Sequence, residues 1–496
     1  MIPIINNNKL WTGVGFTKND ENRYFLTKRL IKKKADPINL LIINTFSGAI
    51  DLFTKKEWKQ IETATKNRNI KALPRNLYKS LVKRGYLFYS QSDEKSSFIE
   101  LMDFYRKRPV ELLNFIIPTG GCNFRCTYCF EMLSYRKNHQ KLSDDQVETS
   151  IQIMKKRFQE SNNRLIRFFG GEPLQLKNIR IIEKYFKFAR EEKLTFAFNS
   201  NGYDLIDYIP LFKEYPDINL YLQVSLDGIA STHNVKRIYT GGKPSFDKIV
   251  SGIDEFVKLP QSNLTIRHNI DKDIINIYDE VISFIKEKKW HKNKKITFQL
   301  SALLESFDKN LKITNIPDIF EIIKLYNSKI VPDPELNNKK FYTNIVSSEA
   351  SYLSTLFNFD MPGIITRKDL HGPMVIYCHS AMDSTKIVYH PDGYLYNCEN
   401  LIGNKKYAIG KYSNNSFTLF EDEIEKWSKR TITNIKECLD CNLGPLCGGG
   451  CPTEIIWRDQ DIFNPSCDKK LKIKLLDMYL DYFIQYKLPN LIKSKT

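Results

Sequence analysis

Three cysteines have the spacing of an iron–sulfur loop. Cys122, Cys126 and Cys129 read C-x3-C-x2-C, directly after the apolar run Leu112–Ile117. Thiolates on such a short loop can hold three corners of a cubic 4Fe–4S cluster. The fourth iron then lacks a protein ligand and can bind a small molecule, as an open zinc position does. The alternatives are a zinc knuckle or a chance cluster of cysteines, but zinc sites more often use paired Cys or Cys/His ligands, and no histidine completes this set locally.

The other cysteines lie together in the C-terminal part of the chain. They are Cys378, Cys398, Cys438, Cys441, Cys447, Cys451 and Cys467. The segment from Gly393 to Cys398 reads G-x4-C, and the segment from Cys438 to Cys451 reads C-x2-C-x5-C-x3-C. Ten cysteines in an intracellular chain argue for metal or redox chemistry rather than disulfides. A pair of zinc ribbons is the alternative, although it would need simpler spacing.

A Gly-Gly-Glu sequence follows an apolar run in the middle of the chain. Gly170, Gly171 and Glu172 come at the end of Arg164–Phe169, which has the composition of a strand. Glycines let the backbone approach a ligand closely, and a carboxylate can accept an ammonium group. We therefore expect ligand contacts at this strand end.

Two further strand ends carry polar residues, followed by a basic one. They are Ser200 and Asn201 after Leu194–Asn199, Ser225 and Asp227 after Leu220–Ser225, and then Arg237. Hydroxyl and carboxylate groups there can bind a ribose or a substrate, and Arg237 can pair with a carboxylate. Turn capping is the alternative for Ser200 and Asp227. His233 is expected to be structural.

The elements that position these residues alternate between strand and helix over residues 109–305. The remaining expected strands are Leu264–Asn269 and Ile296–Leu300, and the expected helices are Val147–Phe158, Ile179–Glu192, Phe246–Leu259 and Ile274–Glu287. About six strand–helix units imply parallel strands with right-handed crossovers. In such α/β folds the site lies at the carboxyl ends of the strands, where the motifs fall.

The cysteine loop, read with Tyr128 as C-x3-C-x-(aromatic)-C, resembles the signature of the radical S-adenosylmethionine (SAM) enzymes. The resemblance implies a partial six-stranded barrel and a cluster whose open iron binds SAM. Cleavage of SAM then releases a 5′-deoxyadenosyl radical. It also implies SAM contacts from Tyr128, Phe130, Gly170, Gly171, Glu172, Ser200, Asn201, Ser225, Asp227 and Arg237.

The later cysteines resemble the seven-cysteine SPASM pattern of peptide-modifying radical SAM enzymes. The resemblance implies two auxiliary 4Fe–4S clusters: Cys438, Cys441, Cys447 and Cys467 would hold one, and Cys378, Cys398 and Cys451 the other. Three clusters, one with its open iron reserved for SAM, need one more thiolate than the chain's ten cysteines supply. No cysteine lies between His371 and Tyr377. The second auxiliary cluster is therefore expected to have an open or non-cysteine position for a substrate thiolate.

Residues 1–108 are expected to form a winged-helix-like domain. The features are a hairpin at Thr45–Gly48, a capping box at Thr54–Glu57, a helix after Pro74 that stops at Gly85, and a strand at Tyr86–Tyr89. The unit resembles domains that recognise the leader of a precursor peptide by β-augmentation. The alternatives are a structural cap or a DNA-binding winged helix.

The rest of the chain gives weaker signals. Residues 306–375, with a break at Pro332–Pro334, are expected to be a connector, residues 376–467 the SPASM domain, and residues 468–496 a C-terminal helix. Its packing face is expected to contain Leu471, Leu475, Met478, Tyr482 and Tyr486.

Charge and hydropathy bound the partners. The net charge of +18 favours an acidic partner, either an acidic leader peptide or a nucleic acid. No apolar run reaches membrane-spanning length, and the N-terminal residues lack the order of a signal peptide, so a cytoplasmic enzyme is expected. Its electron would come from an external donor of the flavodoxin or ferredoxin type.

These features predict a maturase that installs a crosslink, most simply a Cys thioether, in a ribosomally made peptide. The first alternative is an anaerobic sulfatase maturase that makes formylglycine, and the second is a nucleic-acid-binding regulator with structural metal. Asp227 and Glu399 are candidates for the base only by position.

Overall fold

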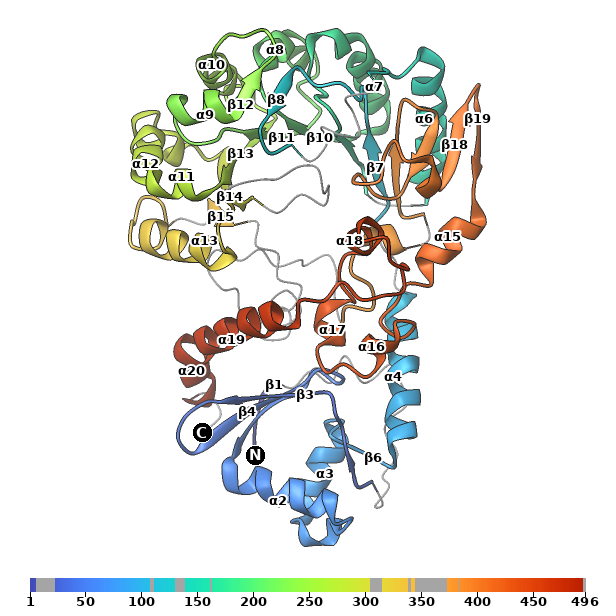
Figure 1. Cartoon of the computed structure of the whole chain (residues 1–496), viewed down its shortest axis with the longest axis vertical. Coiled ribbons are helices and arrows are strands. Elements are labelled where there is room, and N and C mark those ends of the chain that lie inside the picture. The colour runs from blue at the N-terminus through green and yellow to red at the C-terminus, as the bar shows by residue number, and fades with distance from the viewer. Residues whose placement is uncertain are drawn as a thin grey trace. The chain divides into compact units, whose positions relative to one another are not determined.

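The computed structural model describes residues 1–5, 23–107, 111–129, 139–160, 163–303, 315–337, 340–343, 373–382 and 384–493. The chain divides into two compact units (Figure 1). The terminal unit contains Met1–Pro109, Val346–Cys378 and Lys429–Thr496, and the central unit contains Val110–Ile345 and His379–Ser428. Residues 379–428 therefore lie with the parallel sheet, whereas the sequence suggested one cysteine-rich domain over 376–467.

The central unit is built on an 11-stranded sheet with the order β15-β14-β13-β11-β10-β9-β7-β16-β17-β18-β19. The strands are β7 (Leu113–Ile116), β9 (Leu165–Phe168), β10 (Thr195–Ser200), β11 (Leu220–Ser225), β13 (Ser262–Ile270), β14 (Ile296–Ala302), β15 (Phe341–Thr343), β16 (Lys386–Tyr389), β17 (Tyr394–Tyr396), β18 (Gly410–Ser413) and β19 (Ser416–Leu419). Neighbours from β15 to β16 are parallel and the rest are antiparallel. The predicted parallel series is confirmed.

Helices join these strands and cover one face of the sheet (Figure 1). They are α6 (Asp144–Gln159), α7 (Ile179–Glu192), α8 (Leu205–Glu214), α9 (Ala230–Lys236), α10 (Phe246–Phe256), α11 (Lys272–Asn276), α12 (Tyr278–Glu287) and α13 (Ile319–Leu325). A further helix, α15 (Glu421–Ser428), follows β19. Phe186 of α7 packs against Phe196 of β10 with ring centroids 4.7 Å apart. Such aromatic pairs fill the layer between helices and sheet.

The sequence missed three parts of this unit. Helix α8 carries Pro210 in its interior, which ordinarily argues against a helix. Strand β15 lies in the expected connector and pairs with β14. Strand β16 adds to the other edge of the parallel strands, where Ile387 lies opposite Asn114 of β7.

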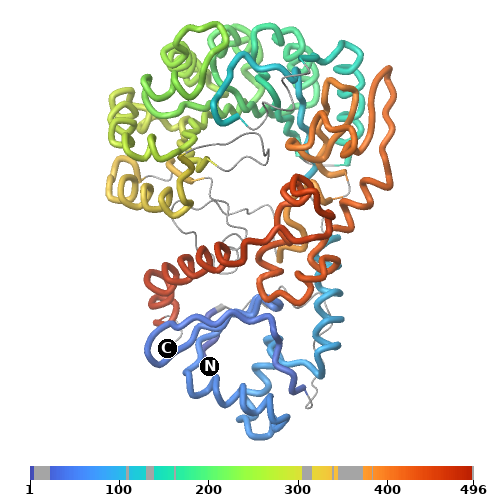
Figure 2. Tube along the Cα trace, in the orientation of Figure 1, coloured from blue at the N-terminus to red at the C-terminus, as the bar shows by residue number. Residues whose placement is uncertain are grey.

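The terminal unit contains both ends of the chain (Figure 2). Its four-stranded sheet has the order β1-β5-β4-β3, from β1 (Ile2–Ile5), β3 (Leu30–Lys34), β4 (Asn39–Asn44) and β5 (Ile50–Thr54). A second sheet pairs β2 (Phe25–Leu26) with β6 (Leu87–Phe88). The helices are α2 (Lys55–Lys66), α3 (Arg75–Lys83), α4 (Gln91–Arg106), α16 (Lys436–Leu439), α17 (Gly444–Cys447), α18 (Pro452–Trp457), α19 (Lys469–Tyr486) and α20 (Leu488–Lys493).

Local signals explain the start of this unit. Gly48 turns the β4–β5 hairpin with a φ of +72°, which glycine adopts at no steric cost. Thr54 accepts from the N–H of Glu57, whose carboxylate accepts in return from Thr54, so the predicted capping box of α2 is confirmed.

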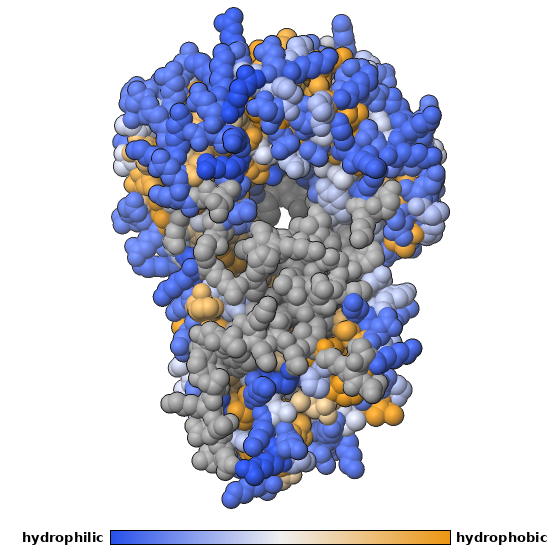
Figure 3. Space-filling model, turned by 180° about the vertical axis from the view of Figure 1, so that it is seen from behind, coloured by the Kyte–Doolittle hydropathy of each residue, from blue (hydrophilic) through white to orange (hydrophobic). Residues whose placement is uncertain are grey.

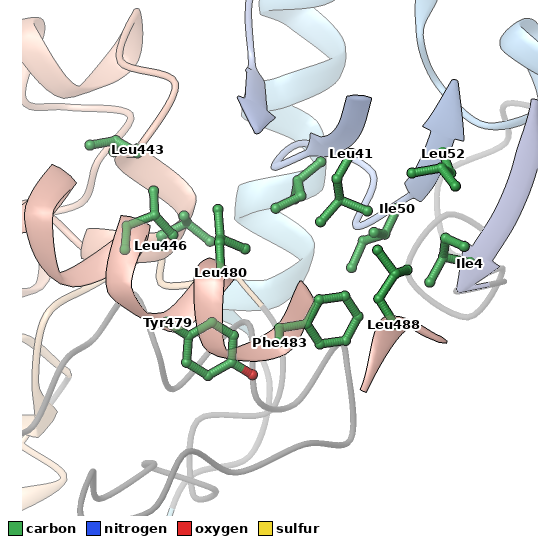
Figure 4. Close-up of a cluster of buried hydrophobic side chains, with 12 residues drawn as sticks. Ile4, Leu41, Ile50, Leu52, Leu443, Leu446, Tyr479, Leu480, Phe483 and Leu488 are labelled. Carbon is green, nitrogen blue, oxygen red and sulfur yellow. The ribbon is translucent and has the colours of Figure 1, made fainter. Parts of the chain in front are cut away.

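One apolar core joins the N-terminal sheet to the C-terminal helices (Figure 4). It contains Ile4, Leu41, Ile43, Ile50, Leu52, Leu443, Leu446, Leu476, Tyr479, Leu480, Phe483 and Leu488. The predicted face of α19 was wrong in part, because Tyr486 is 53% exposed and the buried side centres on Tyr479 and Phe483. The helix carries two apolar stripes, and periodicity alone does not show which one meets the sheet.

The described surface is mostly hydrophilic on the face seen in Figure 3, with hydrophobic side chains in small groups. Within the part of the chain that the structure describes, none of the helices combines the length and apolar character needed to cross a bilayer.

Candidate active site

The first cysteine loop is held by its own backbone. Strand β8 (Phe124–Cys126) pairs with β12 (Arg237–Tyr239), and this register places Cys126 opposite Arg237. The N–H of Phe124 donates to Cys122 Sγ across 3.3 Å. Burial raises the pKa of the Cys122 and Cys126 thiols, so each needs a cationic partner such as iron in order to ionise.

The Gly-Gly-Glu turn lies directly against this loop. A Cβ on Gly171 would lie 2.3 Å from the carbonyl oxygen of Gly121, and the N–H of Glu172 donates to that oxygen across 3.1 Å. Gly170 has a φ of +84° and lies against Ile117. Gly171 therefore permits a close backbone approach to the segment that leads into the cysteine loop, and contact of either glycine with a ligand stays a prediction.

The carboxylate of Glu172 joins two strand ends. It is buried and accepts from the Ser200 hydroxyl at 2.7 Å, the Asn201 N–H at 2.6 Å and the Leu174 N–H at 2.8 Å. Burial raises the pKa of Glu172 to about 7, although the three donors oppose that shift. A carboxylate has further lone pairs, so its expected contact with an ammonium group stays a prediction.

Asn201 extends these contacts to the cysteines. Its Nδ2 donates to Asn123 Oδ1 across 2.7 Å and lies 3.9 Å from Cys122 Sγ. Ser200 also accepts from the N–H of Gly202 at 2.9 Å, so the turn-capping role considered for Ser200 is present. Asn201 therefore positions the cysteine loop directly, while Ser200 contacts Glu172, and contact of either residue with SAM stays a prediction.

A second group of contacts centres on the hydroxyl of Tyr128. This hydroxyl donates to Asp227 and accepts from Arg237 Nη1 at 2.7 Å and from Asn269 Nδ2 at 3.0 Å. Asp227 is fully buried, and its Oδ1 accepts from both the N–H and Nδ2 of Asn269. Four segments of the chain meet at this one hydroxyl.

Asn269 is the site residue that the sequence interpretation missed. It lies near the carboxyl end of β13, where the rule applied to the other strand ends would have selected it. It carries no recognisable motif of its own, however.

The other predicted residues take varied places. Ser225 ends β11 opposite Arg267, and Phe130 lies outside the described residues. His233 is buried and its Nδ1 accepts from the N–H of Asp227 at 3.2 Å, consistent with the expected structural role. Burial would raise the pKa of Glu399, but the charge of Lys386 lowers it overall, which makes Glu399 a poor base.

The face of the sheet away from the helices is polar. Arg167, Asn199, Arg267 and Gln299 are half-buried there, on alternate positions to the apolar residues that face the helices. Arg167 donates to Asn199 Oδ1 at 3.1 Å, and neither arginine has a carboxylate oxygen within 4.0 Å among the described residues. Parallel sheets are usually apolar on both faces, so this face suits a polar ligand.

In the terminal unit, glycines shape the turns between the expected ligands. Gly448, Gly449 and Gly450 all have positive φ, and they separate Cys447 from Cys451. A Cβ on Gly450 would lie 1.9 Å from the carbonyl oxygen of Ser466, and the N–H of Ser466 donates to the carbonyl of Gly449. These bonds bring the segment before Cys467 beside the glycine turn.

Two features of the described cysteines suit clusters. None of the ten forms a disulfide, and within the described ranges no three Cys, His, Asp or Glu side chains converge as they would on a single metal ion. A cubane spaces its ligands farther apart than one ion does. Each group of candidate thiol ligands also has a buried arginine nearby. Arg237 lies near Cys126, and Arg430 lies near the cysteines of the terminal unit. Cys398 lies in the central unit, and its membership of a ligand set stays a prediction.

Comparisons with known proteins agree with this site. Residues 116–281 match the radical SAM superfamily. A cysteine-type anaerobic sulfatase-maturating enzyme of Clostridium novyi is 23% identical over 67% of this chain and 85% of its own length.

Two solved structures share the fold. The structure of native anSMEcpe with bound AdoMet and Cp18Cys peptide has a TM-score of 0.54 and 19% identity, and the match covers 78% of this chain and 99% of that one. Streptococcus suis SuiB bound to the precursor peptide SuiA has a TM-score of 0.52 and 16% identity, with coverage of 90% and 99%. The chain is therefore an enzyme with a radical SAM domain that is homologous to anaerobic sulfatase maturases.

Proposed function

We propose that the chain matures a ribosomally made precursor peptide and installs a crosslink in it. When bound at Cys122, Cys126 and Cys129, a 4Fe–4S cluster supplies the electron that cleaves SAM to a 5′-deoxyadenosyl radical, which abstracts a hydrogen atom from a peptide carbon. The chain's own task is to position SAM and peptide and to exclude water.

The polar contacts at the strand ends suit this task. Arg237 is buried and bonded to Tyr128 through Nη1, while its Nε has no acceptor among the described residues. A free N–H on a positioned guanidinium is suited to a carboxylate such as that of methionine. Glu172 remains the acceptor proposed for the ammonium group, because SAM carries both groups on one carbon.

The observation that carries the peptide assignment is the edge strand β3. In the terminal sheet as described, β3 pairs only with β4, and its sequence is Leu30-Ile31-Lys32-Lys33-Lys34. Lys33 pairs with Asp477 and Asp481, whereas Lys34 is exposed and has no ion pair among the described residues. An acidic leader could add to such an edge as a further strand.

The proposed product is a Cys thioether. Forming a carbon–sulfur bond removes one hydrogen atom from the carbon, one proton from the thiol and one electron. The electron needs an acceptor, which is the role proposed for clusters at the C-terminal cysteines. Asp227 is fully buried and holds the Tyr128 hydroxyl and Asn269, so its proposed role is to position these groups rather than to take the proton.

Anaerobic turnover with dithionite tests the proposal. We expect 5′-deoxyadenosine from SAM, and we expect a small peptide encoded beside this gene to lose two hydrogens when the two are co-expressed. The modified cysteine should resist alkylation. No 5′-deoxyadenosine would favour the nucleic-acid-binding alternative.

Sulfatase maturation is the second candidate, because the Clostridium novyi relative has that name. A sulfatase-derived cysteine peptide converted to an aldehyde, which hydrazide probes detect, would support this candidate over the crosslinking one.

A further inference from the structure

A buried arginine lies among the cysteines of the terminal unit. Arg430 is fully buried. Its guanidinium donates to four backbone carbonyls: those of Ile462 at 2.6 Å, Gly450 at 3.0 Å, Gly449 at 3.1 Å and Asn464 at 3.2 Å. Two of these carbonyls directly precede Cys451 and the other two precede Cys467, so one side chain fixes both segments.

No carboxylate balances this charge. In the part of the chain that the structure describes, Arg430 has no carboxylate oxygen within 4.0 Å. Burial lowers the pKa of Arg430, and the charged groups that oppose this shift are the thiolates of Cys378, Cys438, Cys451 and Cys447. A Cβ on Gly449 would lie 3.6 Å from Arg430 Nη1 and 3.8 Å from Cys438 Sγ, so both atoms border the space beside Gly449.

These four cysteines come from both proposed auxiliary ligand sets: Cys438 and Cys447 from one, Cys378 and Cys451 from the other. We propose that Arg430 is the shared counter-ion of the auxiliary clusters and raises their reduction potential. This proposal rests on the proposed ligation of clusters by those cysteines. One-electron reduction adds a negative charge to a thiolate-ligated cluster, and a fixed cation in a low-dielectric site stabilises the reduced form.

The measurement is an EPR-monitored redox titration of reconstituted protein with dithionite as reductant. Replacing Cys122, Cys126 and Cys129 by Ala in every sample removes the SAM-binding cluster from the spectra. Iron content of this background tests ligation first: no bound iron would overturn the cluster assignment and, with it, the role of Arg430.

In that background we expect Arg430→Met to move the auxiliary midpoint potentials to more negative values, and Arg430→Lys to keep most of the wild-type potential because it keeps the charge. Arg458→Met is the matched control, since the Arg458 side chain is 55% exposed and pairs with Glu454. Its potentials should not move.

Unchanged potentials in Arg430→Met, or an equal shift in Arg458→Met, would overturn the proposal. If Arg430→Met loses iron while Arg430→Lys retains it, the need for the charge is supported. If both lose iron equally, Arg430 acts only through its carbonyl bonds and the counter-ion role is wrong.

Discussion

The backbone N–H of Asn201 donates to Glu172 Oε2 across 2.6 Å, and this bond ties the Gly-Gly-Glu turn to the end of β10. Asn201 also donates to Asn123, inside the cysteine loop. Two motifs that look independent in the sequence therefore form one support for the loop. A change in either should be felt at the cysteines.

Replacing Glu172 by Gln should change how stability depends on pH. Burial raises the pKa of Glu172 from 4.5 to about 7, so the folded chain keeps a proton that the unfolded chain has lost between these values. The stability due to this group is fully present below pH 4.5 and is lost as the pH rises to 7, by about 3 kcal/mol. Gln does not titrate and lacks this loss.

Urea unfolding of reduced, iron-free protein at several pH values measures this difference. Wild type should lose stability relative to Glu172→Gln as the pH rises from 4.5 to 7. Glu335→Gln is the control, because Glu335 is exposed and lies outside the site. If wild type instead gains stability relative to Glu172→Gln as the pH rises, the donors from Ser200, Asn201 and Leu174 outweigh burial.

The sequence predicted the parallel strands because each one is an apolar run followed by a recognisable turn. It placed Glu172 at a strand end correctly, since strand ends follow from local pattern. It did not predict that Glu172 accepts from Ser200 and Asn201, because which side chain meets which depends on the register between β9 and β10. Asn269 was missed because it carries no recognisable motif, and β16 because its partner β7 lies far away in sequence.

Replacing Tyr128 by Phe should loosen the centre formed by Asp227, Arg237 and Asn269. Without the hydroxyl, the Asp227–Arg237 pair at 3.8 Å loses its bridging group inside a buried site. Leaving buried polar groups without a partner costs about 1–3 kcal/mol. We expect weaker SAM binding by calorimetry with iron content unchanged.

Tyr221→Phe is the matched control, because Tyr221 is 51% exposed on β11. It should match wild type in both measurements. Equal SAM affinity in the Tyr128 variant would show that the hydroxyl contacts do not position the SAM site.

Replacing Gly171 by Ala should displace the cysteine loop. The new Cβ would lie 2.3 Å from the carbonyl oxygen of Gly121, and that atom is backbone and cannot rotate away. We expect reconstituted Gly171→Ala to lose the iron bound at the first loop, measured as the difference from a protein that lacks those three cysteines. Gly242→Ala is the control. Its new Cβ would meet no atom within 4 Å, and only the backbone strain at a φ of +73° remains, which costs about 1 kcal/mol. Full iron content in Gly171→Ala would mean that the loop tolerates the shift.

The last prediction concerns Arg29, which connects the N-terminal sheet to the loop between Cys438 and Cys441. Arg29 Nη1 donates to the carbonyl of Cys441 at 3.1 Å, Nη2 donates to that of Leu439, and the guanidinium lies 3.4 Å from the centre of the Phe98 ring. Hydrogen bonds from a charged group contribute about 1.5–3 kcal/mol each. Arg29→Met should therefore lower auxiliary iron in protein whose first cysteine loop is replaced by alanines.

Arg29→Lys should recover part of that iron, because a lysine can reach only one of the two carbonyls as a point donor. Lys59→Met removes an exposed charge from the same sheet-and-helix segment and should have no effect. If Arg29→Met keeps its auxiliary iron, the N-terminal sheet does not support the cluster loop. In that case its packing against Leu443 and Leu446 serves folding alone.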